Sequence, residues 1–147
     1  MKIALVCSPG GHLTQMLLLI EAFEGHNIFF ITHTNPRTNQ LKYKKYFIVN
    51  IGTNIRKMVT AFFQTFKILT KEKPDLIVST GSEIAIPVMI LARFIKIKTI
   101  YIESWTRIKT KSGTGRILYL FSNHFLVQWP DLVKKYGKKA RYEGAVI

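Results

Sequence analysis

The chain has 147 residues, and 48% of them are hydrophobic, which excludes a disordered chain and provides enough apolar surface for one packed core. It carries 22 basic and 8 acidic residues, and the resulting formal net charge of +14 indicates an anionic partner: nucleic acid, an acidic membrane surface or a phosphorylated substrate. The one cysteine excludes a disulfide framework, and no apolar run reaches the roughly 20 residues of a membrane-spanning helix, so we predict a single domain over residues 1–147 in a reducing compartment.

The first stretch of the chain predicts a strand, a glycine turn and a helix. Residues Lys2–Cys7 are apolar and partly β-branched, which is typical of a strand buried on both faces. Residues 8–11 (Ser-Pro-Gly-Gly) break it, and a helix is predicted over residues 13–24, with Gly25 ending it. Outward-pointing N–H groups and the helix dipole together predict an anion site with His12 at its rim. The two glycines also suit a plain tight turn, and they do not form the G-x-G-x-x-G dinucleotide pattern.

The rest of the chain continues this alternation of strands and helices. Further strands are predicted over residues 27–32, 46–50, 75–80, 98–102 and 124–128. Helices are predicted from a cap at Thr53 or Asn54 to about residue 71, and over residues 84–94, 115–122 and 131–136. Residues 33–45 are predicted as a basic loop and residues 138–141 as a basic turn. Strands that alternate with helices predict an α/β fold with a Rossmann-like, doubly wound parallel sheet.

The helix that ends near residue 71 has an apolar stripe. The stripe consists of Ile55, Met58, Val59, Phe62, Phe66 and Leu69. The favoured interpretation is that this stripe packs on the sheet, as in an ordinary surface helix. The alternative is a basic amphipathic helix that contacts a membrane, with Phe63 at the edge of the stripe and Lys67 on the polar face. Arg107 and Lys109, in a basic loop later in the chain, are further candidates for membrane or partner contact.

Four loops are predicted to meet at the carboxyl edge of the sheet, where parallel α/β sheets bind their ligands: residues 8–12, 80–83, 103–105 and 128–130. Glu103 ends an apolar strand, so we interpret it as functional, or as the partner of a nearby lysine or arginine. Glu83 and Asp131 are interpreted as early helix residues that complement the helix dipole. His12 is a candidate general base, or a residue that orders the turn. The histidines lack metal-ligand spacing, so no metal site is predicted.

Four segments resemble the acceptor-side subunits of split glycosyltransferases. They are Ser-Pro-Gly-Gly-His-Leu-Thr-Gln at residues 8–15, Lys-Pro-Asp-Leu-Ile-Val-Ser-Thr-Gly at 73–81, Tyr-Ile-Glu-Ser at 101–104 and Phe-Leu-Val-Gln-Trp at 125–129. Bacterial members of this family act in capsule and exopolysaccharide synthesis. The eukaryotic relative anchors the transferase that adds a second N-acetylglucosamine to dolichyl diphosphate.

This resemblance implies the fold of the N-terminal, acceptor-binding half of a GT-B glycosyltransferase. It implies that a separate chain binds the UDP-sugar, that this chain binds a polyprenyl-diphosphate-linked sugar, and that it is inactive alone. The candidate diphosphate-binding residues are Ser8, Gly10, Gly11, His12, Gly81 and Ser82. The candidate catalytic residues are His12 and Glu103. No cofactor is implied, and the chain is expected at the cytoplasmic face of a membrane, held there by its basic amphipathic surface.

Two other functions compete with this one. The net charge of +14 suits a nucleic-acid-binding α/β protein, although no nucleic-acid module is recognisable. The first loop suits a flavin- or nucleotide-binding module, although the dinucleotide pattern is missing.

Overall fold

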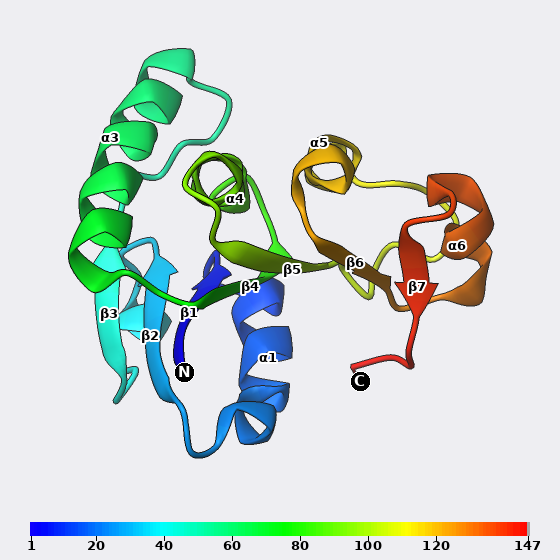
Figure 1. Ribbon diagram of the computed structural model, residues 1–147, viewed down its shortest axis with the longest axis horizontal. Coiled ribbons are helices and arrows are strands. Elements are labelled where there is room, and N and C mark those ends of the chain that lie inside the picture. The colour runs from blue at the N-terminus through cyan, green and yellow to red at the C-terminus, as the bar shows by residue number, and fades with distance from the viewer. Residues whose placement is uncertain (147) are drawn as a thin grey trace.

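The computed structural model describes residues 1–146, which form one sheet of seven parallel strands between two layers of helices (Figure 1). The strands are β1 (Lys2–Cys7), β2 (Asn27–Thr32), β3 (Lys44–Phe47), β4 (Leu76–Gly81), β5 (Lys98–Ile102), β6 (His124–Val127) and β7 (Ala140–Tyr142). They lie side by side in the order β3-β2-β1-β4-β5-β6-β7. The predicted doubly wound α/β fold is therefore confirmed.

The helices divide between the two faces of the sheet. They are α1 (Gly11–Leu18), the 3-10 helix η1 (Ile20–Phe23), α2 (Pro36–Asn39), α3 (Ile55–Glu72), α4 (Ala85–Phe94), α5 (Gly113–Phe121) and α6 (Pro130–Tyr136). Figure 1 shows α3, α4 and α5 above the sheet and α1 below it. Side chains of α1 and η1 pack with Ile3 and Leu5 of β1, whereas side chains of α3 and α4 pack with Ala4 and Val6, which point to the opposite face. Among residues 1–146, no helix has the length and apolar character needed to cross a bilayer.

The direction of strand addition reverses between β1 and β4, which are neighbours in the sheet. In open parallel sheets a ligand binds outside the carboxyl ends of the strands at such a switch point. The loop that follows β1 is the Ser-Pro-Gly-Gly turn, and the loop that follows β4 contains Ser82 and Glu83. The topology thus brings two of the four predicted loops together at the place where the fold favours binding.

Some predicted boundaries were wrong. Helix α1 begins at Gly11 rather than Leu13, because Gly10, with φ 95°, already turns the chain as its N-cap. It ends at Leu18, and the rest of the predicted helix is the short η1. The predicted basic loop contains α2, whose N-cap Asn35 accepts a hydrogen bond from the Arg37 N–H. Asn followed by Pro is a helix-start signal that the high local charge obscured.

The two edge strands also differ from the prediction. Strand β3 begins two residues and ends three residues earlier than predicted, and residues 140 and 141 of the predicted basic turn pair, together with Tyr142, with β6 as β7. Both are short, exposed edge strands with charged side chains, so the apolar pattern that marks a buried strand is weak in them. The buried strands β1, β2 and β5 have the predicted boundaries.

Helix α3 presents a different face to the core from the predicted one. The buried residues are Ala61, Thr65, Ile68, Leu69 and Glu72. Ile55, Val59, Phe63 and Phe66 are 80%, 53%, 67% and 48% exposed, and we call this set the α3 outer face. The prediction that the apolar stripe packs on the sheet is therefore wrong for Ile55, Val59 and Phe66, whereas Leu69 is buried and Met58 packs against the core. The helix directs this other face toward the sheet for two reasons. The small side chains of Ala61 and Thr65 allow close packing, and polar partners bind Glu72 on the side that faces the sheet.

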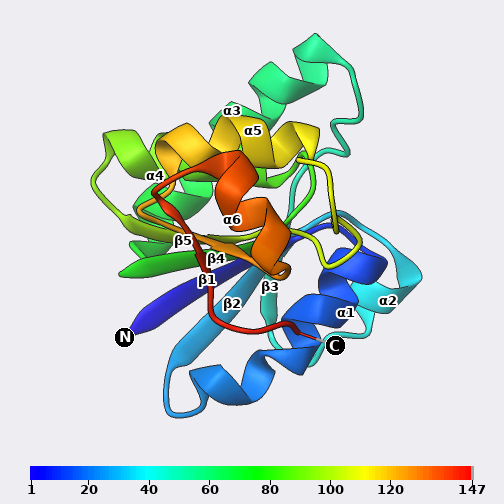
Figure 2. The same cartoon turned by 90° about the vertical axis from the view of Figure 1, so that its right-hand side faces the viewer.

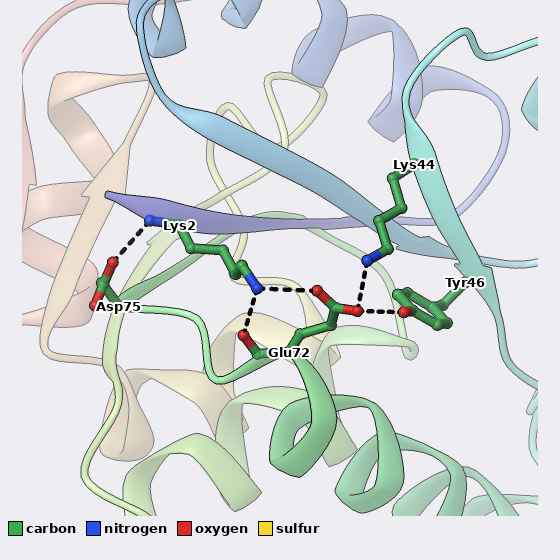
Figure 3. A network of polar contacts seen from close by, with 5 residues as sticks. All are labelled: Lys2, Lys44, Tyr46, Glu72 and Asp75. Atoms are coloured by element: carbon green, nitrogen blue, oxygen red, sulfur yellow. Dashed lines mark hydrogen bonds and ion pairs between the residues drawn. The ribbon is translucent and has the colours of Figure 1, made fainter.

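Glu72 is buried at the end of α3 and holds three elements together (Figure 3). Its carboxylate accepts hydrogen bonds from Lys44 Nζ at 2.7 Å, from Lys2 Nζ at 3.2 Å and from the Tyr46 hydroxyl. Lys2 Nζ also donates to the Glu72 carbonyl at 2.9 Å. These partners, Lys44 first, lower the pKa of the Glu72 carboxyl from its ordinary 4.5 to about 2. The network therefore joins α3 to β1 and β3 through one ionised group.

Replacing Glu72 with glutamine is expected to lower the free energy of unfolding at pH 7 by about 1–3 kcal/mol, because two lysines lose their counter-charge. Since the pKa of Glu72 is lower in the folded chain, its stabilising contribution is full above pH 4.5 and is lost as the pH falls toward about 2. Urea unfolding of wild type and Glu72→Gln over this range measures the effect. The difference between them should shrink on acidification, whereas a difference independent of pH would contradict the assignment. Glu24→Gln, on the surface, is the control.

Candidate functional site

The glycine turn is open to solvent. Gly11 is exposed, and Ser8 and Gly10 are partly exposed. A Cβ atom added at Gly10 or Gly11 would meet nothing within 4 Å. Gly11 is the first residue of α1, which has no side-chain cap, so the first-turn N–H groups of α1 are left for water or a ligand. The turn where an anion site is predicted is thus accessible to a ligand from solvent.

Arg37 brings a cation to this turn. Its Nη1 donates to the Gly10 carbonyl at 3.2 Å, and its Nη2 donates to the Thr14 hydroxyl at 3.1 Å. The guanidinium comes from the short helix α2, which follows β2 in the chain. Sequence reasoning counted Arg37 only as one charge of a basic loop. Because β1 and β2 pair in parallel, the loops that follow them lie at the same edge of the sheet. That expected pairing of consecutive strands could have placed Arg37 near the glycine turn.

His12 is oriented by its neighbours in β4. Its Nδ1 lies 2.8 Å from the Thr80 carbonyl oxygen, and the Thr80 hydroxyl donates to the His12 carbonyl at 2.8 Å. A carbonyl can only accept, so Nδ1 carries the proton and Nε2 of the neutral ring retains its lone pair. Gly81 makes room for this ring, because a Cβ there would lie 3.0 Å from His12 Cε1. His12 is thus held with Nε2 available as an acceptor.

Glu103 is fully buried and is surrounded by hydrogen-bond donors. Oε1 accepts from the Ser104 N–H at 2.9 Å and from the Tyr101 hydroxyl at 3.4 Å. Oε2 accepts from the hydroxyl and the N–H of Ser112, at 2.9 and 3.3 Å, and from the Tyr136 hydroxyl. None of the ion pairs within residues 1–146 includes Glu103, so the predicted alternative of a lysine or arginine partner is wrong. Neutral hydrogen-bond donors stabilise the Glu103 carboxylate instead.

These contacts fix the loop between β5 and α5. Burial, followed by the nearby Glu103 carboxylate, raises the pKa of both the Tyr101 and the Tyr136 phenols, so both remain protonated donors. Ser112, held by Glu103, is the N-cap of α5 and accepts from the Gly115 N–H at 2.8 Å. A Cβ at Gly115 would overlap Glu103 and Tyr136. Glu103 therefore positions one wall of the site.

A polar pocket of about 250 Å³ lies among these groups. It is lined by His12, Ser82, Glu83, Tyr101, Glu103, Ser104, Thr106, Arg107, Ser112, Gly113 and Thr114. The structure thus brings the predicted residues His12, Ser82, Glu103 and Arg107 to one cavity. Ser8, Gly10 and Gly11 lie outside its lining on the adjacent turn, while Phe63 and Lys67 are exposed on α3.

Glu83 differs from its predicted role. It precedes α4 instead of lying in its first turn, and its Oε1 is 3.4 Å from Nε2 of the buried His33. The Ser82 hydroxyl donates to the other carboxylate oxygen. His33, as the largest cause, lowers the pKa of the Glu83 carboxyl to about 2. Asp131, by contrast, lies in the first turn of α6 as predicted.

The predicted convergence of four loops is confirmed by the contacts between them. Gln128 Nε2 donates to the Glu103 carbonyl at 2.8 Å, and Trp129 Nε1 donates to the Trp105 carbonyl at 2.6 Å. With its amide oxygen turned toward Trp105, Gln15 of α1 accepts from both N–H groups of that residue at 2.9 Å. The loop after β5 is thus tied to α1 on one side and to the end of β6 on the other.

A second, cationic pocket of about 430 Å³ lies beside this loop and is lined by Lys109, Thr110, Lys111, Arg116 and Lys135. Lys135 Nζ donates to the Lys109 carbonyl, and Lys111 Nζ lies 5.1 Å from the centre of the Tyr136 ring. The ion pairs among residues 1–146 use only Glu72 and Glu83 as acids, so these cations have no acidic partner in the described chain. The pocket is a strongly positive surface next to the site.

Comparisons with known proteins agree with this architecture. The model of the family described as "Oligosaccharide biosynthesis protein Alg14 like" matches residues 47–146. The human UDP-N-acetylglucosamine transferase subunit ALG14 is 25% identical over 181 residues, covering 100% of this chain and 83% of the relative. The UDP-N-acetylglucosamine–N-acetylmuramyl-(pentapeptide) pyrophosphoryl-undecaprenol N-acetylglucosamine transferase of Staphylococcus haemolyticus is 28% identical over 156 residues, covering 93% of this chain and 43% of the relative.

Among solved structures, the MurG protein of Acinetobacter baumannii superposes with a TM-score of 0.81 at 17% identity. The match covers 99% of this chain and 45% of that chain, so the present chain spans less than half of MurG. At this identity the likeness concerns the fold alone. It agrees with the predicted architecture of one half of a GT-B glycosyltransferase.

Proposed function

The chain belongs to the family of Alg14-like oligosaccharide biosynthesis proteins, and on that premise we propose that it is the acceptor-side subunit of a two-chain, UDP-sugar-dependent glycosyltransferase. It binds a polyprenyl-diphosphate-linked sugar and presents that sugar to a nucleotide sugar held by a second chain. The observation that carries the proposal is the solvent-open glycine turn at the switch point, with Arg37 on one side and His12 on the other. The product is a lipid-linked oligosaccharide or a polysaccharide precursor.

The diphosphate of the acceptor lies at the first turn of α1. The uncapped N–H groups there and the positive end of the helix dipole favour an anion, and Gly10 and Gly11 leave the approach open. Arg37 supplies a guanidinium, which suits paired phosphate oxygens. Ser8 of the turn and Ser82 of the loop after β4 are further candidates for contact with the diphosphate, although the Ser82 hydroxyl donates to Glu83.

His12 acts as the general base. The acceptor hydroxyl attacks the anomeric carbon of the donor sugar, its proton passes to His12 Nε2, and UDP leaves with the electrons of the broken bond, which inverts the configuration. Nε2 is the free nitrogen because Nδ1 donates to Thr80. Glu103 is a positioning residue, since its two carboxylate oxygens already accept from Ser104, Ser112 and two tyrosines.

The donor-binding partner is required for transfer. The purified chain alone is expected to transfer no sugar above background, because the described residues form one Rossmann-like unit and GT-B chemistry takes place between two. Co-expression with its donor-binding partner should give transfer to lipid-linked acceptor in membranes, measured with radiolabelled UDP-N-acetylglucosamine, the donor in the human relative's name. Full activity of the purified chain without a partner would contradict the proposal.

The α3 outer face and the cationic pocket suit a peripheral position on an anionic, cytoplasmic membrane surface. Figure 2 shows the first turns of α3 projecting beyond the other helices. These turns follow the carboxyl end of β3, so they share an edge of the sheet with the glycine turn. Each cation near anionic lipid contributes about 1 kcal/mol, and a buried phenylalanine contributes about 1.5–3 kcal/mol.

Phe63→Ser combined with Lys67→Gln is expected to weaken binding to phosphatidylglycerol vesicles about 10-fold or more, because an apolar anchor and a charge are both removed. Co-sedimentation with vesicles measures this. Leu18→Ser removes an exposed apolar side chain from the opposite face and serves as the control. Equal binding by the double variant, or tight duplex DNA binding without vesicle binding, would contradict the membrane assignment.

A further inference from the structure

The polar pocket contains one carboxylate whose surroundings leave it available to a ligand, that of Glu83. We propose that Glu83, held by His33, binds the hydroxyl groups of the acceptor sugar and selects a neutral sugar over one that carries a carboxylate. This inference rests on the proposed function, because it assigns the pocket beside the glycine turn to the sugar that the diphosphate carries. Sequence reasoning had assigned Glu83 to the helix dipole.

Access distinguishes Glu83 from Glu103, the other acid in the lining. Glu103 has no exposed surface, and its two oxygens accept hydrogen bonds from the backbone and from three hydroxyl groups. The Glu83 side chain is 33% exposed and is contacted by two groups, His33 and Ser82. An ionised carboxylate has about four acceptor positions, so Glu83, which also accepts from its own backbone N–H, retains at least one for a ligand.

His33 fixes the direction of the Glu83 side chain. The imidazole is buried, its Nδ1 lies 3.1 Å from the Ile48 carbonyl oxygen, and its Nε2 has no hydrogen-bond partner within residues 1–146. Because Nδ1 donates to that carbonyl, Nε2 is the ring nitrogen that faces Glu83, at 3.4 Å from its Oε1 atom. A buried ring nitrogen that faces a partly exposed carboxylate costs desolvation free energy, which a function of the carboxylate would explain.

Ser82 holds the second oxygen from the backbone side. It is one of the few non-glycine residues with a positive φ, 77°, and this strained conformation directs its hydroxyl to Glu83. The two contacts leave the carboxylate little rotational freedom. A rigid acceptor of this kind loses less entropy when it binds sugar hydroxyls, which favours it as a selectivity element.

The size and charge of the pocket define the ligand. Its volume of about 250 Å³ is below the roughly 300–1,000 Å³ of pockets for drug-sized ligands, so it suits a single sugar ring. His33 contacts Glu83, and the other titratable or charged groups that line the pocket are His12, Tyr101, Glu103 and Arg107. A hydroxyl can donate to Glu83, whereas a uronic acid would place a second carboxylate against it without a proton to share.

Binding to the isolated chain tests this without the donor partner. Calorimetry with farnesyl diphosphate, glucosyl-diphospho-farnesol and glucuronosyl-diphospho-farnesol compares the bare anion, the neutral sugar and the acidic sugar. We expect wild type to bind the glucosyl ligand about 10-fold or more tighter than farnesyl diphosphate, and to bind the glucuronosyl ligand no tighter than farnesyl diphosphate. Glu83→Gln should bind the glucosyl and the glucuronosyl ligands with affinities similar to its affinity for farnesyl diphosphate. Its affinity for farnesyl diphosphate itself should stay unchanged.

The variants distinguish a failure of sugar binding by Glu83 from a failure of diphosphate binding by the glycine turn. His33→Asn should reduce the ratio of the affinity for the glucosyl ligand to that for farnesyl diphosphate, without changing the binding of farnesyl diphosphate. Glu24→Gln, on the surface, should change neither affinity. Unchanged sugar selectivity in Glu83→Gln would overturn this inference while leaving the diphosphate site intact. If wild type bound no farnesyl diphosphate, the proposed function would fail, and this inference with it. Binding of farnesyl diphosphate by each variant also reports that the variant is folded.

Discussion

His12→Ala is expected to reduce the kcat/KM of sugar transfer about 10²- to 10⁴-fold in the two-chain enzyme, which is the usual contribution of a positioned general base. The expectation follows from the hydrogen bond between Nδ1 and the Thr80 carbonyl, which leaves Nε2 as the acceptor at the pocket. Transfer to a diphosphate-linked acceptor in membranes, with the partner chain present at a fixed ratio, measures the loss.

His26→Ala provides the matched control, since His26 is an exposed histidine immediately before β2, at the opposite edge of the sheet. A base acts on the chemical step, so the loss in His12→Ala should fall on kcat more than on the affinity for farnesyl diphosphate. A variant that retains wild-type kcat would show that another group, such as one on the partner chain, takes the proton. Glu103→Gln should instead lower stability, since Glu103 organises a loop.

Gly11→Leu is the second substitution with a large expected effect. Gly11 is exposed, has no positive φ, and has nothing within 4 Å of its Cβ position, so leucine fits and improves the helix by about 0.8 kcal/mol. The side chain would nevertheless cover the first-turn N–H groups that we propose to hold the diphosphate. The loss of two charge-assisted hydrogen bonds predicts a fall in transfer and in farnesyl diphosphate binding of about 100-fold or more.

Stability and activity should therefore change in opposite directions at this position, which separates a blocked site from a damaged fold. Thermal unfolding should show Gly11→Leu to be as stable as wild type or more so, with Gly11→Ala intermediate in binding. Gly10 is unsuitable for this test, because its φ of 95° would strain any other residue. A Gly11→Leu protein that transfers sugar at the wild-type rate would remove the glycine turn from the mechanism.

The parts of the fold that could be predicted are those whose signal lies in a single segment. Strand β1 and the glycine turn after it were evident from one apolar run and its break, and the strands β2 and β5 from their β-branched residues. Parallel alternation then placed the four loops at one edge of the sheet, which predicted that His12 and Glu103 lie near each other, and both line the same pocket.

The rest depended on contacts between distant segments. The orientation of α3 is set by Glu72, whose partners Lys2 and Lys44 lie 70 and 28 residues away. The pairing of Glu83 with His33 and the approach of Arg37 to Gly10 likewise join residues from different strand ends. Local periodicity carries no information about such pairs, so the sequence identified the apolar stripe of α3 but not the side that it presents.

The central claim is that the glycine turn holds a lipid-borne diphosphate. Amide chemical shifts of the isotope-labelled chain, followed by NMR during titration with farnesyl diphosphate, test it most directly. We predict saturable shifts concentrated at Gly10, Gly11 and His12, with a smaller response at the Arg37 side chain. Shifts confined to the cationic pocket around Lys109 and Lys135, with the turn unaffected, would contradict it.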